Sequence, residues 1–226
     1  MNRIENTQSI IRALKEILAD DKTLHPLQRQ ALEQFIADPE HHQTGIFDLA
    51  TGFGKTCMMG ILMTAYLKAC PDGKVVITVP TRTLIKNDVD GGHITRLQRY
   101  FRNFNQRFSS DPLDIGAFYA DKKQPEKQVI ITTYQSLNSL IEQIGLEDVG
   151  LLLLDEAHHT ITEKRIAAVK AFSNASQYGL TATPYYSPDK SLSMVLGNTI
   201  AQVDVRKAIQ EGLLSNISNM LLVSDL

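Results

Sequence analysis

Two short segments of the sequence carry residue types suited to phosphate and magnesium chemistry. The first consists of Ala50, Thr51, Gly52, Phe53, Gly54, Lys55 and Thr56, between a short apolar run and a long helix-like run. Its glycines let backbone amides curl around an anion, and the start of a helix adds unsatisfied amides and a positive dipole end. Lys55 suits contact with β- and γ-phosphates, and the Thr56 hydroxyl suits Mg²⁺. The segment therefore predicts a phosphate-binding loop.

One position of this segment departs from the strict phosphate-loop pattern, because Leu49 stands where that pattern has its first glycine. The same residues could also form an ordinary helix start, with a glycine turn and an exposed lysine. Support from elsewhere in the chain is therefore needed to choose between the two interpretations.

The second segment comes 100 positions after Lys55 (155 minus 55) and consists of Asp155, Glu156, Ala157 and His158. Four leucines precede it, so its carboxylates fall at the end of a buried strand, where α/β proteins place their ligand crevice. Asp155 suits Mg²⁺, directly or through water, and Glu156 suits orienting and deprotonating an attacking water. Acids after a strand can also merely open a solvated loop, but the upstream loop favours the catalytic interpretation.

The elements that must position these segments follow an alternating pattern. Short apolar runs predict strands at 46–50, 74–79, 114–119, 129–133, 150–154 and 177–181. Helix-like stretches separate them, at 26–37, 55–69, 93–108, 135–143 and 162–172. This alternation predicts an α/β fold with a mostly parallel sheet and helices on both faces.

The chain shows no Pro-, Gly- or Ser-rich linker, so we expect one domain over residues 1–226. Within it, residues 1–22 are expected to form an accessory amphipathic helix, centred on 7–19. Residues 24–184 hold the motifs, and 185–226 form an exit segment with a short helix at 204–213 that ends at Gly212.

Taken together, the ordered motifs resemble the first RecA-like domain of superfamily two helicases of the DEAD/DEAH type. Within this superfamily, the motifs look most similar to those of the branch that contains the type I and type III restriction-enzyme motors. Members of that branch often lack the first glycine of the loop. The resemblance covers residues 24–214. It implies a RecA-like P-loop NTPase fold, a three-layer sandwich.

The resemblance also implies roles for residues outside the two segments. Gln28 falls where the family recognises adenine, although it could be a surface residue of an amphipathic helix. In the family's pattern His158 connects to the motif that contains Thr181 and Thr183, which couples the nucleotide state to the rest of the motor. Nucleic-acid backbone contacts are implied for four residues in two strand-end motifs: Thr81, Arg82, Thr133 and Tyr134. Thr81 and Arg82 could instead only cap a helix.

The activity implied by the resemblance is MgATP hydrolysis coupled to movement on nucleic acid, with DNA favoured and RNA open. Such a motor needs a second RecA-like domain with an arginine-rich motif, which this sequence lacks. We therefore expect it to be part of a longer protein, and to be weakly active or inactive alone. A nucleotide-sensing module that does not hydrolyse is the main alternative, and an unrelated phosphate-loop ATPase is a third.

Composition narrows the remaining classes of protein. The formal net charge of -2 means that basic residues must be concentrated locally if nucleic acid is bound. The two cysteines, Cys57 and Cys70, lack metal-ligand spacing and suit a reducing compartment. The polar start and the absence of a long apolar run favour a soluble cytoplasmic protein without a membrane segment.

Two further patterns invite functional interpretations that we do not favour. The histidine pairs 41–42 and 158–159 lack a third ligand at useful spacing for zinc. A stretch of arginines and aromatic residues could stack on single strands, but its apolar residues recur at helical spacing and are expected to face the core. That stretch comprises Arg96, Leu97, Arg99, Tyr100, Phe101, Arg102, Phe104, Arg107 and Phe108.

Overall fold

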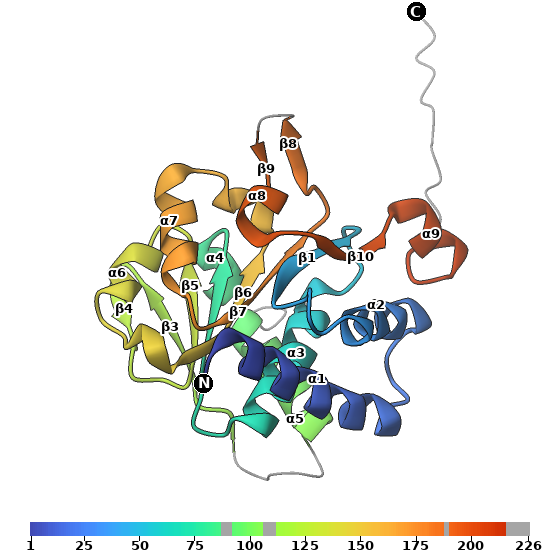
Figure 1. The fold of residues 1–226 in the computed structure, drawn as a ribbon, viewed down its shortest axis with the longest axis horizontal. Coiled ribbons are helices and arrows are strands. Elements are labelled where there is room, and N and C mark those ends of the chain that lie inside the picture. The colour runs from blue at the N-terminus through green and yellow to red at the C-terminus, as the bar shows by residue number, and fades with distance from the viewer. Residues whose placement is uncertain (87–91, 106–111, 188–189, 216–226) are drawn as a thin grey trace, which may run out of the picture.

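A central eight-stranded sheet organises the computed structural model, which describes residues 1–86, 92–105, 112–187 and 190–215 (Figure 1). Its strand order is β10-β1-β7-β6-β2-β5-β3-β4, and every neighbouring pair is parallel except β3 with β4. The strands are β1 (Thr44–Leu49), β2 (Lys74–Val79), β3 (Ile115–Tyr119), β4 (Lys122–Lys123), β5 (Val129–Thr133), β6 (Val149–Asp155), β7 (Ser176–Thr181) and β10 (Thr199–Val203). A separate antiparallel pair consists of β8 (Tyr185–Ser187) and β9 (Lys190–Ser191).

Helices cover both faces of this sheet, as the alternating sequence pattern predicted. One layer consists of α1 (Arg3–Asp20), α2 (Pro26–Ala37), α3 (Lys55–Ala69) and α5 (His93–Asn105). The other consists of α6 (Leu137–Ile141), α7 (Glu163–Ala171) and α8 (Ser193–Leu196), with short 3-10 turns η1 (Leu146–Asp148) and η2 (Ala157–Thr160). Every residue of β6 is buried because both layers cover it. The predicted three-layer α/β sandwich is confirmed.

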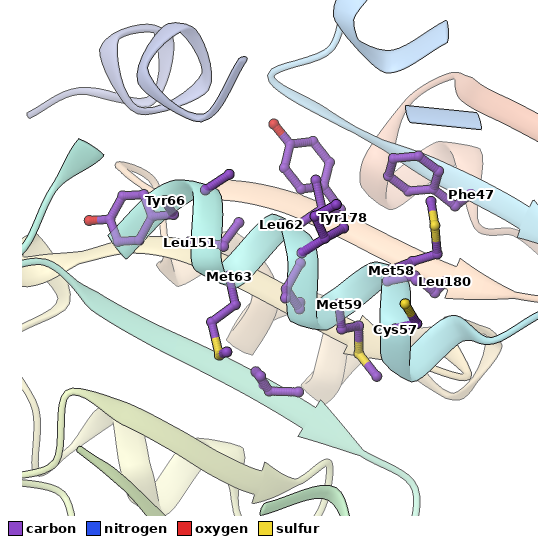
Figure 2. Close-up of a cluster of buried hydrophobic side chains, with 14 of the residues drawn as sticks. Phe47, Cys57, Met58, Met59, Leu62, Met63, Tyr66, Leu151, Tyr178 and Leu180 are labelled. Atoms are coloured by element: carbon purple, nitrogen blue, oxygen red, sulfur yellow. The ribbon is translucent and has the colours of Figure 1, made fainter. Parts of the chain in front are cut away.

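The helix that follows the phosphate-loop segment is buried on all sides. Residues 57–67 of α3 are all buried, because the sheet covers one side of the helix and α1 and α5 cover the others. Figure 2 shows its methionines and Tyr66 among side chains from β1, β6 and β7, such as Phe47, Leu151 and Tyr178. A close-packed setting of this kind holds the first turn of α3 in place, and that turn carries Lys55 and Thr56.

Several predicted boundaries agree with the structure, and others differ in ways that have a local cause. The bounds of α2, α3, β2 and β5 are those predicted. The helix expected at 135–143 spans only Leu137–Ile141, since the residues before it form turns after β5. The helix expected at 93–108 is described as far as Asn105, and residues 106–111 lie outside the described part of the chain.

The terminal segments of the chain join the same sheet and layers. The accessory helix α1 runs from Arg3, earlier than the 7–19 stretch expected, and the Thr7 hydroxyl lies 2.7 Å from that of Ser176 on β7. The exit segment contributes β10, which sequence reasoning missed, and α9 (Val205–Gln210). Leu49, the residue in place of the first loop glycine, is fully buried at the end of β1 and pairs with Val203 of β10.

The arginine and aromatic stretch lies on α5. Leu97 and Phe104 are buried, and Tyr100 and Phe101 pack partly buried against the core, while Arg102 is exposed. The expectation that the apolar residues of this helix face the core is confirmed for these four side chains; Arg107 and Phe108 lie outside the described residues. Among the helices described, none is long and apolar enough to cross a bilayer.

Candidate active site

The glycine segment forms a loop between β1 and α3 at the carboxyl end of the sheet. Gly52 and Gly54 have φ values of +85° and +96°, in the left-handed region that glycine adopts without steric cost. A Cβ on Gly54 would lie 2.6 Å from Nε2 of Gln28, so that position also has no room for a side chain. Helix α3 then starts at Lys55 with no cap from any described side chain, which leaves its first amides available to an anion.

The acidic pair lies at the end of β6, beside this loop. Asp155 is the last residue of the strand and is 6% exposed, whereas Glu156 is half-buried with φ +47°. A left-handed conformation is unusual for a non-glycine residue and costs about 1–3 kcal/mol. The turn aims consecutive carboxylates in different directions, and such strained positions cluster at functional sites.

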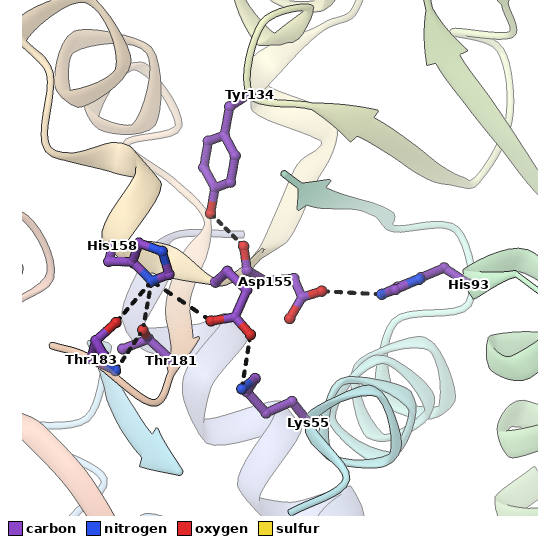
Figure 3. Close-up of polar contacts among 8 residues, drawn as sticks. Lys55, His93, Tyr134, Asp155, His158, Thr181 and Thr183 are labelled. Atoms are coloured by element: carbon purple, nitrogen blue, oxygen red, sulfur yellow. Dashed lines mark hydrogen bonds and ion pairs between the residues drawn. The ribbon is translucent and has the colours of Figure 1, made fainter. Parts of the chain in front are cut away.

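The two segments meet through an ion pair. Nζ of Lys55 lies 2.9 Å from Oε1 of Glu156, with exposed fractions of 10% and 30% for the two side chains (Figure 3). The sequence separates these residues by about a hundred positions, but β1, β7 and β6 are successive neighbours in the sheet, so their carboxyl ends adjoin. The predicted juxtaposition of loop and acids is therefore present.

A second contact joins the acidic segment to the end of β7. Nδ1 of His158 lies 3.0 Å from the Thr181 hydroxyl oxygen, 3.2 Å from that of Thr183 and 3.6 Å from Oε2 of Glu156 (Figure 3). The backbone N–H of Thr183 also donates to the Thr181 hydroxyl, at 3.1 Å. These four residues, which sequence reasoning assigned to catalysis and coupling, form one polar group.

Gln28 lies against the phosphate loop rather than on an open helix face. Its Nε2 donates to the carbonyl of Phe53 at 2.9 Å, and its Oε1 accepts from the backbone N–H of His25 at 3.2 Å. The side-chain amide of glutamine has two N–H groups and two acceptor lone pairs. One N–H group and one acceptor lone pair of Gln28 therefore remain for another partner. The edge of adenine requires one donor and one acceptor of this kind.

The four residues expected at nucleic acid divide into two kinds. Thr81 and Arg82 are exposed, at the start of α4 (Arg82–Lys86), and Thr133 is buried but borders the same cavity. That cavity, of about 490 Å³, lies at the carboxyl ends of β2, β5 and β3. Lys123 and Ser136 also line it. Lys123 belongs to no motif of the resemblance, whereas Ser136 lies in the same strand-end motif as Thr133 but was not among the predicted contact residues.

Tyr134, the fourth of these residues, has a buried side chain. Its side chain is 3% exposed, and its hydroxyl donates to the backbone carbonyl of Asp155 at 2.9 Å (Figure 3). Burial, with the nearby charges of Asp155 and Glu156, raises the pKa of this phenol well above its ordinary value, so it stays a donor. The side chain therefore supports the acidic segment from within instead of facing nucleic acid.

His93 is the site residue that sequence reasoning missed. It begins α5 and lies 3.1 Å through Nε2 from Oδ2 of Asp155, with both side chains buried (Figure 3). The only sequence signal was a histidine that begins a helix after a strand-end motif, which by itself is common.

By contrast Cys57, in the first turns of α3, is inert, because burial raises the pKa of its thiol to about 11.

The chemistry of the site fits a nucleoside triphosphate with Mg²⁺. The loop offers backbone amides and an ammonium group to phosphate, while Thr56 and Asp155 offer hard oxygen ligands. Magnesium in such sites commonly takes one or two protein oxygens together with phosphate oxygens and water. Among the described residues, no three or more His, Cys, Asp or Glu side chains form a group that could hold a metal by itself.

The fold and this site together define a RecA-like domain that carries a phosphate-loop segment beside an acidic pair. The family described as "Type III restriction enzyme, res subunit" matches residues 21–186, and the chain belongs to that family.

Curated relatives and solved structures extend the likeness. The chain is 29% identical to a putative ATP-dependent RNA helicase of Methanocaldococcus jannaschii, covering 87% of this chain and 25% of that protein. It is 27% identical to the DNA 3'-5' translocase XPB2 of Sulfurisphaera tokodaii, covering 92% and 41%. The Pyrococcus furiosus Hef helicase domain has a similar fold, with a TM-score of 0.53, 24% identity and coverage of 76% and 38%. The chain thus spans less than half the length of these proteins.

Proposed function

We propose that this chain is the nucleotide-binding half of an ATP-driven motor that moves along nucleic acid. The observation that carries the proposal is the Lys55–Glu156 pair, 2.9 Å apart, at a glycine loop beside the carboxylate that ends β6. Helicases and translocases among its relatives, one described for RNA and one for DNA, support the same activity. We favour DNA as the track, since the restriction-enzyme branch that the motifs resemble moves on it.

In this proposal ATP binds on the loop with its phosphates against the amides of residues 51–56. Lys55 leaves Glu156 for the β- and γ-phosphates, and its charge stabilises negative charge on the transferred phosphoryl group. Thr56 and Asp155 would hold Mg²⁺, which would neutralise phosphate charge when bound. Gln28 uses its remaining N–H and lone pair on adenine.

Glu156 acts as the base in this scheme. Once Lys55 has turned to the phosphates, the Glu156 carboxylate is free to orient a water and accept its proton. His158 touches both Glu156 and the hydroxyls of Thr181 and Thr183, so a displacement of Glu156 reaches the end of β7 directly. We propose that this contact couples the nucleotide state to motion.

The nucleic-acid backbone is proposed to lie over the cavity at the ends of β2, β5 and β3. Hydroxyls of Thr81, Thr133 and Ser136 and the charges of Arg82 and Lys123 border it. Hydroxyl and cationic groups of this kind hold phosphates without reading sequence. A second RecA-like domain of the full-length protein would supply the arginines that complete the ATPase, so this half alone is expected to turn over slowly.

The experiment measures ATP hydrolysis by the full-length protein with and without duplex DNA, for the wild type and Glu156→Gln. Removing the base should lower turnover by about 10²- to 10⁴-fold while MgATP still binds. Glu163→Gln, an exposed glutamate at the start of α7, is the matched control and should retain wild-type turnover. Turnover that is absent in the wild type, or unchanged in Glu156→Gln, would leave a nucleotide-sensing module as the better description.

A further inference from the structure

His93 occupies a buried position between the two functional ends of the molecule. Its ring is 5% exposed, at the first residue of α5. Nδ1 lies 3.0 Å from the backbone carbonyl of Leu84 on α4, and Nε2 lies 3.1 Å from Oδ2 of Asp155. Figure 3 shows the ring reaching the Asp155 carboxylate from the side opposite His158. One side chain therefore connects α4 with the last residue of β6.

The Asp155 carboxylate is a hydrogen-bond acceptor, so the ring donates to it from Nε2, while Nδ1 lies within hydrogen-bond distance of the Leu84 carbonyl. A histidine held at its two ends has a fixed orientation and fixes its partner in turn. A carboxylate has acceptor sites on both oxygens, so a bond to Oδ2 is compatible with a cation, or its bound water, at Oδ1. The contact with His93 therefore restricts the rotation of the Asp155 carboxylate without occupying all of it.

A different residue holds the backbone of Asp155. The Tyr134 hydroxyl donates to the Asp155 carbonyl at 2.9 Å, from the end of β5. Tyr134 thus fixes where the residue lies, while His93 fixes how its side chain is turned. A buried histidine with a purely structural role would bond to other groups of the core. His93 instead donates a hydrogen bond to the carboxylate that is expected to hold magnesium.

We infer that His93 is the positioning residue of the magnesium site, and that through Leu84 it connects the Asp155 carboxylate to the segment that borders the nucleic-acid cavity. This inference rests on the proposed function, because it needs Asp155 to hold Mg²⁺. Leu84 lies two residues after Arg82, in the same helix α4. If binding of nucleic acid displaces α4, the Leu84 carbonyl moves with it. The ring of His93 and the Asp155 carboxylate would then move as well.

The test is equilibrium binding of a fluorescent ADP analogue to the full-length protein, in Mg²⁺ and in EDTA. Two variants of similar side-chain length separate donor loss from volume loss: His93→Met has no donor, and His93→Gln keeps an amide donor. In His93→Met the tightening of binding by Mg²⁺ should fall about 10- to 100-fold, the usual effect of losing such a supporting hydrogen bond. Affinity in EDTA should stay at the wild-type value, and His93→Gln should recover part of the lost tightening.

His42→Met is the matched control. Nδ1 of His42 also contacts a helix backbone carbonyl, that of Phe35 at 2.9 Å, but on the N-terminal side of the sheet and away from Asp155. It should leave both affinities unchanged. Circular dichroism and thermal unfolding of every variant establish that the fold is intact, since removing one member of a buried pair can destabilise a protein.

The outcomes separate this inference from the proposed function. If Mg²⁺ tightens nucleotide binding in the wild type and equally in folded His93→Met, His93 does not position the magnesium site. Equal weakening with and without Mg²⁺ would also overturn the inference, because it would indicate a merely structural role. If His93→Met does not fold, His93→Gln decides: a partial loss of tightening that is confined to Mg²⁺ supports the positioning role, and either unchanged tightening or equal weakening in Mg²⁺ and EDTA contradicts it. A wild type whose binding is indifferent to Mg²⁺ would refute the proposed magnesium site and the inference together.

Discussion

The carboxyl edge of the sheet carries two proposed sites that are built differently. We call the site around Lys55 and Glu156 the nucleotide end, and the cavity beside Arg82, where nucleic acid is proposed to lie, the track end. At the nucleotide end, the functional side chains already contact one another: Lys55 with Glu156, and His93 with Asp155. At the track end, Thr81 and Arg82 are exposed and border a cavity of about 490 Å³. Partly buried charges need partners to offset desolvation, whereas exposed groups are solvated by water until a ligand arrives.

Because of this difference, substitutions at the two ends should have different effects. Each functional side chain at the nucleotide end is held by another, so its loss should affect chemistry and local order together. At the track end a single side chain contributes one contact among several, so its loss should weaken binding only slightly.

After Glu156→Gln, Lys55→Ala should cause the largest loss. It removes the ammonium group from the phosphate loop and leaves Glu156 without its partner, so ATP turnover should fall about 10²- to 10³-fold, as for loss of one charge-stabilising donor. Steady-state ATPase assays of the full-length protein measure this effect.

Lys127→Ala is the control for that experiment. Nζ of Lys127 lies 2.8 Å from Oδ1 of Asp114 in an exposed pair, where the pKa of the Asp114 carboxyl is lowered by this contact. Exposed pairs contribute little to stability, so neither turnover nor melting temperature should change measurably. Equal losses in both variants would mean that Lys55 is only another surface lysine.

Gly54→Ala should come next. Its φ of +96° costs a non-glycine residue about 1–2 kcal/mol, and the new methyl group would meet Nε2 of Gln28. The loop should shift, and nucleotide affinity should fall about tenfold, since 1.4 kcal/mol corresponds to a factor of ten. Titration with a fluorescent nucleotide measures the loss.

Gly212→Ala provides the comparison for the loop glycine. Gly212 has a φ of +75°, but a Cβ there has open space, with nothing within 4 Å. This variant should lose stability from the same backbone strain and keep its nucleotide affinity. If both variants bind nucleotide alike, the contact between loop and Gln28 is not part of the site.

Arg82→Ala tests the track end, where the expected effect is smaller. Loss of one phosphate contact should reduce the slope of log affinity against log salt by about 0.9 for duplex DNA. Affinity should fall several-fold and ATP turnover at saturating DNA should not change. Fluorescence anisotropy across a salt series measures both quantities, with Arg12→Ala, an exposed arginine of α1, as control. An unchanged slope would remove Arg82 from the interface.

The sequence predicted the nucleotide end better than the track end, for a physical reason. Phosphate and magnesium chemistry requires particular residues at fixed spacing, so Lys55 and Glu156 could be found from the order of motifs alone. Buried apolar runs likewise identified β2, β5 and β6. Supporting contacts such as that of His93 depend on which helix start meets which strand end, and a single sequence does not encode that in any local pattern.

The edge of the sheet shows the same limit. Strand β10 has two exposed residues among its five, in a burial pattern that neither alternates nor runs unbroken, whereas β5, of the same length, is buried throughout. It became recognisable only through its pairing with β1. The burial of the Tyr134 side chain could not be predicted for a related reason: the motif identified the strand end, but burial depends on neighbours that the motif does not specify.

Tyr134→Phe should have the smallest effect and sharpens the comparison most directly, because Tyr134 belongs to a track-end motif by sequence and to the nucleotide end by contact. The change removes the donor to the Asp155 carbonyl and keeps the ring over which the Arg165 guanidinium lies at 5.7 Å. The free energy of unfolding should fall by about 0.5–1.5 kcal/mol, measured in urea, with the salt dependence of DNA binding unchanged. Tyr100→Phe, at a partly exposed ring of α5, should change stability by less than about 0.5 kcal/mol. A reduced salt slope with full stability in Tyr134→Phe would return this residue to the track and show that the two ends are less separate than their contacts indicate.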